Sequence, residues 1–146
     1  MENSFEIISY VGAKPLLFGM TRGQVEAIVG PPITKTTDDL GETEASYKSF
    51  NIQYSKQDKS LVEVGFSKSA GVKIHGLDLF NDPKAFLHLL REDSCPYESF
   101  GFIILLDLGI TLTGFHDGDP NQLAITAFAR GRWDHLKSDF KKFKIP

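Results

Sequence analysis

Histidine and cysteine are the residue types in this 146-residue chain that are best suited to metal binding or nucleophilic catalysis. The chain has four histidines, far apart in the sequence and with no two at the spacing of paired metal ligands: His75, His88, His116 and His135. Its single cysteine, Cys95, stands among acidic residues whose charges disfavour a reactive thiolate. We therefore predict no catalytic residue, no metal site and no cofactor, and we expect that the protein is not an enzyme.

The densest group of possible cation ligands is the segment HDGDPN at residues 116–121. Asp117 and Asp119 can offer carboxylate oxygens, but the segment lacks the distal glutamate and the ligand ladder of a calcium loop. Asp-Gly and Asp-Pro are also dipeptides that tight turns favour. The segment therefore predicts a turn, and we count the two aspartates among the candidate contacts to a partner.

Two further features favour binding of another protein. Four acidic residues fall within seven positions and can steer a basic partner, with a solvated loop as the alternative: Asp38, Asp39, Glu42 and Glu44. The chain also holds 12 Phe, four Tyr and one Trp, more aromatic residues than its helix faces require. Several of these are candidates for interface anchors on an exposed sheet face, with core packing as the alternative: Tyr47, Tyr54, Phe115 and Phe128.

Charge and composition narrow the class of partner. The net charge is −3, but residues 130–146 carry a local +4, which leaves −7 on residues 1–129. An acidic body argues against nucleic-acid binding, because neutralising phosphates needs clustered Lys and Arg. No apolar run is long enough to span a bilayer, and the start of the chain lacks the pattern of a secretory signal. A lone cysteine is typical of a reducing compartment, so we expect a cytoplasmic protein with neither nucleic acid nor membrane as partner.

The best-defined element that could position these side chains is a helix at residues 21–29. Thr21 can cap it while Gln24 returns a hydrogen bond, which is the spacing of a capping box, and Gly30 ends it. The spacing predicts one apolar face on this helix, made of Val25, Ile28 and Val29.

The rest of the chain alternates between strand and helix patterns. Strands are predicted near residues 47–54, 61–67, 72–77, 100–106, 110–115 and 123–129. Helices are predicted at residues 82–91 and 133–143. We expect an irregular or short-helical lead-in at residues 4–17 and an exposed loop or ragged edge at residues 33–45. This order predicts an α+β fold in which helices pack on one face of an antiparallel sheet.

The element order also indicates a helix-plus-β-meander unit that is used twice, with half-repeats at residues 18–77 and 78–146 of a single domain spanning residues 1–146. Residues 18–32, FGMTRGQVEAIVGPP, followed by an aromatic-led hairpin and LVEVGF, resemble the repeat of the β-lactamase-inhibitor-protein-like superfamily. The outer-membrane-assembly lipoproteins are relatives in that superfamily. The residues that match its pattern are Gly19, Met20, Thr21, Val25, Ile28, Val29, Gly30 and Pro32. The match covers about residues 18–66, and it implies a sheet whose open face binds another protein.

In size, acidity and lack of catalytic motifs the chain also resembles the immunity proteins that neutralise co-encoded bacterial toxins. That resemblance implies a partner that is a toxin domain with a basic surface. Two alternatives stay open. The first is a cell-envelope assembly or structural module on the same scaffold, although the lipidated cysteine of the lipoproteins is absent near the start of the sequence. The second is a small-ligand binder or enzyme that uses His116 or His75 with a carboxylate.

Overall fold

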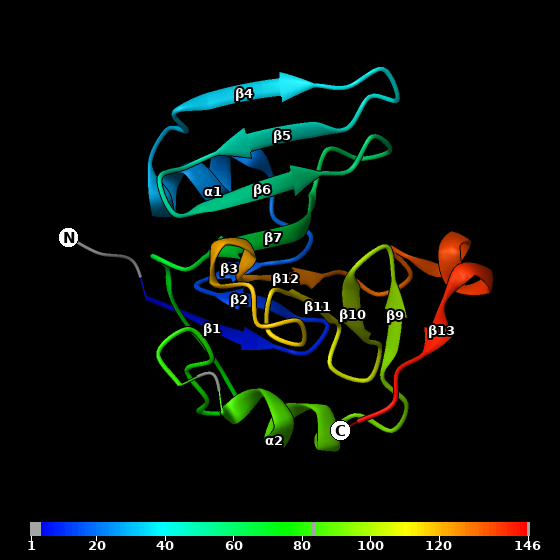
Figure 1. Ribbon diagram of the computed structural model, residues 1–146. Coiled ribbons are helices and arrows are strands. Elements are labelled where there is room, and N and C mark those ends of the chain that lie inside the picture. Colours follow the sequence, from blue (N-terminus) through cyan, green and yellow to red (C-terminus); the bar gives the residue numbers. More distant parts are fainter. Residues whose placement is uncertain (1–3, 83, 146) are drawn as a thin grey trace.

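Two β-sheets make up most of the computed structural model, which describes residues 4–82 and 84–145 (Figure 1). In chain order the strands are β1 (Ser4–Ile8), β2 (Gly12–Lys14), β3 (Leu16–Leu17), β4 (Thr34–Thr37), β5 (Thr43–Ser46), β6 (Phe50–Tyr54), β7 (Leu61–Ser67), β8 (Gly71–Ile74), β9 (Tyr97–Ser99), β10 (Phe102–Leu105), β11 (Ile110–Thr113), β12 (Ala124–Phe128) and β13 (Lys141–Lys142). The helices are α1 (Arg22–Val29), α2 (Ala85–Glu92) and the 3-10 helices η1 (Pro120–Gln122) and η2 (Asp134–Asp139).

The larger sheet has nine strands in the order β13-β9-β10-β11-β12-β7-β6-β5-β4, and its neighbouring strands are antiparallel. The smaller sheet has the order β3-β2-β1-β8, and in it β1 and β8 run parallel. A parallel pair needs a long connection, and here the chain between β1 and β8 builds α1 and four strands of the larger sheet.

The core lies between the two sheets. Along β6 buried and half-buried residues alternate, and the register places Phe50 opposite Phe66 of β7. Phe5 of the small sheet packs on both rings, with centroid distances of 5.0 Å to each. The small sheet therefore covers the inner face of the larger sheet at β6 and β7.

This architecture contradicts the predicted α+β fold. The layer on the inner face is a second sheet, and the two α-helices, of eight residues each, lie at opposite ends of the molecule (Figure 1). The predicted duplication is also wrong. The third strand of the proposed first half, β8, leaves β6 and β7 and pairs with β1 in the other sheet. Element order along the chain does not specify which sheet a strand joins, because non-local pairing decides that.

The capping prediction for α1 is confirmed, while its predicted apolar face is only partly correct. The Thr21 side chain accepts a hydrogen bond from the Gln24 backbone at 3.2 Å, and the Thr21 backbone donates to the Gln24 side chain at 2.9 Å. Val25 is buried, but Ile28 is 40% exposed. None of the helices in the described residues is both long and apolar enough to cross a bilayer.

Both ends of the chain differ from the prediction. The expected irregular lead-in forms β1, β2 and β3, because β8 supplies a pairing partner that is distant in sequence. The expected last helix is η2, followed by β13. A 3-10 helix has three residues per turn, so Trp133 and Leu136 recur on one side in it much as in the first turn of an α-helix.

Candidate functional site

The face of the large sheet that points away from the small sheet is the candidate site, and we call it the open face. Directly paired residues of antiparallel strands project from the same side of a sheet. The register carries one such row across all nine strands: Lys142, Tyr97, Ile104, Thr111, Thr126, Gly65, Asn51, Ser46 and Thr34. A second row holds Phe128, Glu63, Gln53, Glu44 and Thr36. The open face is therefore polar over β4 to β7 and becomes apolar toward β10.

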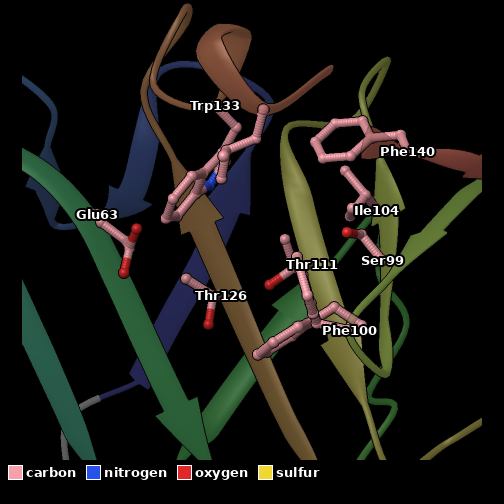
Figure 2. Close-up of a pocket in the computed structure, with 10 residues that line it drawn as sticks. Glu63, Ser99, Phe100, Ile104, Thr111, Thr126, Trp133 and Phe140 are labelled. Carbon is pink, nitrogen blue, oxygen red and sulfur yellow. The ribbon is translucent and has the colours of Figure 1, made fainter. Parts of the chain in front are cut away.

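A hollow of about 250 Å³ lies on the open face over β10, β11 and β12. Thr111 of β11 and Thr126 of β12 form the floor of this hollow. Figure 2 shows the Trp133 ring on one side of them and Phe100 on the other. Leu136 and Phe140 line it as well. The chain after β12, residues 130–140, thus forms one wall of the hollow, and we call this segment the C-terminal cover.

Arg132 fastens the C-terminal cover to the sheet. Its Nη1 and Nη2 donate to the two carboxylate oxygens of Glu42, at 2.6 and 3.0 Å, and its Nε donates to Glu63 at 3.1 Å. The guanidinium also lies 5.1 Å from the ring centroid of Trp133, whose ring meets Phe128 edge to face. These contacts hold the Trp133 ring at the edge of the hollow.

Burial and hydrogen bonding shift the pKa of each of the three charged groups in this cluster. Burial opposes the charge of Arg132, yet its hydrogen bonds to the carboxylates raise its pKa above the ordinary value. Hydrogen bonds from Arg132 lower the pKa of Glu42, whereas burial raises the pKa of Glu63 because the guanidinium offsets only part of the desolvation. Glu63 thus places a poorly solvated carboxylate at the margin of the hollow.

Phe100 is the most exposed large apolar side chain in the described part of the chain, at 88%. It occupies the first position of the two-residue turn between β9 and β10, with φ of 51°, and Gly101 follows with φ of 83°. Asn, Asp and Gly suit this left-handed position, whereas a bulky aromatic residue is strained there. Stability of the fold does not explain a phenylalanine at this place.

The open face continues from the hollow toward β6. A second, wider depression of about 400 Å³ has Gly65 and Asn51 among its lining residues and shares Thr126 with the first hollow. A Cβ atom on Gly65 would lie 2.4 Å from the Asn51 amide oxygen, so this glycine allows the close approach of the Asn51 side chain. The two depressions form a continuous surface across the middle of the sheet.

The four predicted acidic contacts lie around the β4–β5 hairpin. Asp38 accepts hydrogen bonds from the backbone of residues 40 and 42, both at 2.9 Å, and Asp39 is exposed in the turn. Glu42 binds Arg132, and Glu44 accepts hydrogen bonds from the side-chain amides of β6. Three of these acids therefore have partners within the chain.

None of the four predicted aromatic contacts lines the first hollow, but Tyr47 lines the second depression and Phe128 lies on the open face beneath Trp133. Tyr47 stacks on Phe50 at 4.6 Å and donates to the Gly30 carbonyl at 2.9 Å, while Tyr54 is buried in the core. Phe115 packs against the aromatic rings of residues 80 and 86, and Phe128 is buried beneath the C-terminal cover.

Asp117 and Asp119 lie in the predicted turn, and each accepts a hydrogen bond from the backbone N–H two residues ahead, at 3.2 and 3.0 Å.

Sequence reasoning missed the residues that line the hollow, Phe100 above all. The structure places Phe100 in a turn and not at the start of the predicted strand at residues 100–106; Gly101 is the one local sign of that turn, because phenylalanine is not a usual residue of a two-residue hairpin.

The two histidines of the enzyme alternative lie apart from the open face. His75 bonds to the Glu92 carboxylate, which also accepts from His88 at 3.1 Å, and this cluster is on the surface of α2. The His116 ring packs edge-on against Phe143. Neither His75 nor His116 lines either depression of the open face. Within residues 4–82 and 84–145, no three His, Cys, Asp or Glu side chains are placed to bind one metal ion.

Comparison of the chain with protein-family models, with curated proteins and with solved structures finds no significant match. The resemblance to the β-lactamase-inhibitor-protein-like superfamily therefore stays a prediction.

Proposed function

We propose that this chain is a non-catalytic protein-binding module that holds its partner against the open face of the large sheet. The observation that carries the proposal is Phe100, an 88% exposed aromatic side chain in a strained turn position beside an apolar hollow. Exposed aromatic residues next to a depression are typical binding hot spots. Strained backbone positions cluster at binding and catalytic sites.

The size of the hollow beside Phe100 favours a protein side chain over a small ligand, whereas the second depression, of about 400 Å³, is within the range of small-molecule pockets. The volume of the hollow beside Phe100, about 250 Å³, is below the ~300–1,000 Å³ that is usual for small-molecule pockets. Such a space accommodates one apolar side chain of a partner, packed between Phe100 and Trp133 (Figure 2).

The carboxylates over β5 to β7 favour a basic partner for the polar part of the open face, away from the C-terminal cover, which belongs to the basic segment at residues 130–146. Glu44 and Glu63 stand in one row of the open face, and Arg132 is the cation that binds Glu63. A Lys or Arg adjacent to the inserted apolar side chain would complement the remaining negative charge. Together with the acidic residues 1–129, this supports a toxin domain with a basic surface as partner, neutralised in the cytoplasm by this chain acting as an immunity protein.

The test measures binding of the chain to the product of the neighbouring gene. The variant Phe100→Asn removes the aromatic ring and keeps a residue suited to the turn. We expect at least tenfold weaker binding, as for loss of a hot-spot aromatic residue. Ile28→Gln, at an exposed apolar position on α1, is the matched control and should leave affinity unchanged.

Two results would count against the proposal in distinguishable ways. If the wild-type chain does not bind the neighbouring gene product, the immunity function is wrong. If it binds but Phe100→Asn binds equally well, the partner uses another surface than the open face.

A further inference from the structure

The hollow on the open face has aromatic walls. Four of the described residues that line it are aromatic, and they come from the β9–β10 hairpin and from the C-terminal cover: Phe100, Phe102, Trp133 and Phe140. Figure 2 shows the rings of Phe100, Trp133 and Phe140 on different sides of the hollow. Ring faces carry partial negative charge and attract cations, and the aliphatic stems of long side chains pack on apolar surface. The walls therefore suit a side chain that has both an apolar stem and a cationic end.

Arg132 shows how this neighbourhood binds a guanidinium group. Its guanidinium lies 5.1 Å from the ring centroid of Trp133 and donates to the carboxylates of Glu42 and Glu63. An aromatic ring and carboxylates thus already share one cation at the margin of the hollow.

The other Arg and Lys residues of the C-terminal cover make contacts elsewhere. The Arg130 guanidinium lies 4.2 Å from the ring centroid of Tyr10, and Lys137 pairs with Asp134 at 2.9 Å. Among the described residues, no Lys or Arg lines the hollow itself. An incoming cation therefore meets no like charge inside it.

Glu63 leaves negative charge at the margin of the hollow that Arg132 does not cancel. It is the one charged residue among the described residues that line the hollow. Arg132 donates to Oε1 of Glu63 and to both oxygens of Glu42, so one positive charge stands between two carboxylates. Burial raises the pKa of Glu63 in spite of this cation. A second cation beside Glu63 is therefore stabilised, because the carboxylate is short of both water and countercharge.

We propose that the hollow binds an arginine side chain of the partner, with the aliphatic stem between Phe100 and Trp133 and the guanidinium beside Glu63. A guanidinium is more weakly hydrated than an ammonium group and stacks on aromatic rings, which favours arginine over lysine in a mostly apolar space. Arginine is also enriched among the residues that dominate the binding energy of interfaces. This inference rests on the proposed function, because it names the side chain that the partner inserts beside Phe100.

Titration of the full chain with N-acetyl-argininamide, followed through the fluorescence of Trp133 at constant ionic strength, measures this site without the partner. The matched probes are the amide of N-acetyl-citrulline, which has nearly the same shape without the charge, and the amide of N-acetyl-leucine, which is apolar. We expect a dissociation constant of about 1–10 mM for the arginine probe and at least about tenfold weaker binding of the other two.

The variant Glu63→Gln tests the role of the carboxylate. It should weaken binding of the arginine probe by about tenfold and leave binding of the citrulline probe unchanged within about threefold. Arg132 keeps its two hydrogen bonds to Glu42 in this variant, so the C-terminal cover is expected to stay in place. Glu6→Gln removes an exposed carboxylate from β1 of the small sheet and is the matched control, which should bind the arginine probe like the wild type.

Three results would overturn the inference: no binding of the arginine probe, equal binding of the arginine and citrulline probes, and undiminished binding by Glu63→Gln. Equal binding of the leucine probe would also overturn it but would leave the proposed function standing, because the hollow would then accept an apolar side chain. Failure of the proposed function is recognised separately, by the absence of binding to the product of the neighbouring gene.

Discussion

The substitution Phe100→Asn should make the fold more stable while it weakens partner binding. A left-handed backbone costs an ordinary L-residue ~1–2 kcal/mol, and asparagine adopts it at lower cost. The ring is 88% exposed, so its packing contributes about a tenth of the ~1.5–3 kcal/mol of a fully buried side chain, or ~0.2–0.3 kcal/mol. The net change is a gain of about 0.5–1 kcal/mol in the free energy of unfolding. In a chain of this size that raises the midpoint of thermal unfolding by roughly 1.5–3 °C.

Urea denaturation monitored through the single tryptophan, Trp133, measures this free energy. The matched control is His75→Asn. Like Phe100, His75 has φ of 51° and is followed by a glycine in a two-residue turn. Its gain should be smaller, because the His75 ring loses its bond to Glu92. A lower free energy of unfolding for Phe100→Asn would refute the reasoning that the turn is strained.

Three further predictions concern the parts that hold the site and the fold together. Arg132→Met should lower the free energy of unfolding by about 2 kcal/mol and speed hydrogen exchange in the C-terminal cover, because Glu42 and Glu63 lose their shared partner. Unchanged exchange would show that Arg132 does not hold the cover. Gly118→Ala should lower the free energy of unfolding by about 1 kcal/mol, because its backbone is left-handed. Gly114→Ala should lower it by at least ~2 kcal/mol more, because its Cβ would lie 2.7 Å from backbone atoms. Equal losses of stability in thermal unfolding would contradict this. Tyr47→Phe should lose about 1 kcal/mol with its bond to a backbone carbonyl, while Tyr54→Phe, whose buried hydroxyl has no partner in the described residues, should lose nothing in urea denaturation.

Local chemistry in the sequence determined several elements correctly. The Thr21 capping box, the alternation in β6 and in the second half of β7, and the turn at residues 116–121 each depend on neighbours a few positions away. The expected exposed loop or ragged edge at residues 33–45 is only partly correct, because β4 is an exposed edge strand but β5 pairs on both sides and buries Ala45. Caps and turns are readable from one sequence because their hydrogen bonds are made within the segment itself.

The tertiary structure alone decided the layers and the site. The small sheet exists because β1 and β8, more than sixty positions apart, pair in parallel, and no local pattern in residues 4–17 indicates that partner. The hollow combines a turn at Phe100, strands β10 to β12 and a cover fastened by Arg132 to Glu42 and Glu63. These groups meet only after the sheet has formed, because strand pairing and ion pairs between distant segments depend on the folded register and on burial rather than on spacing along the chain.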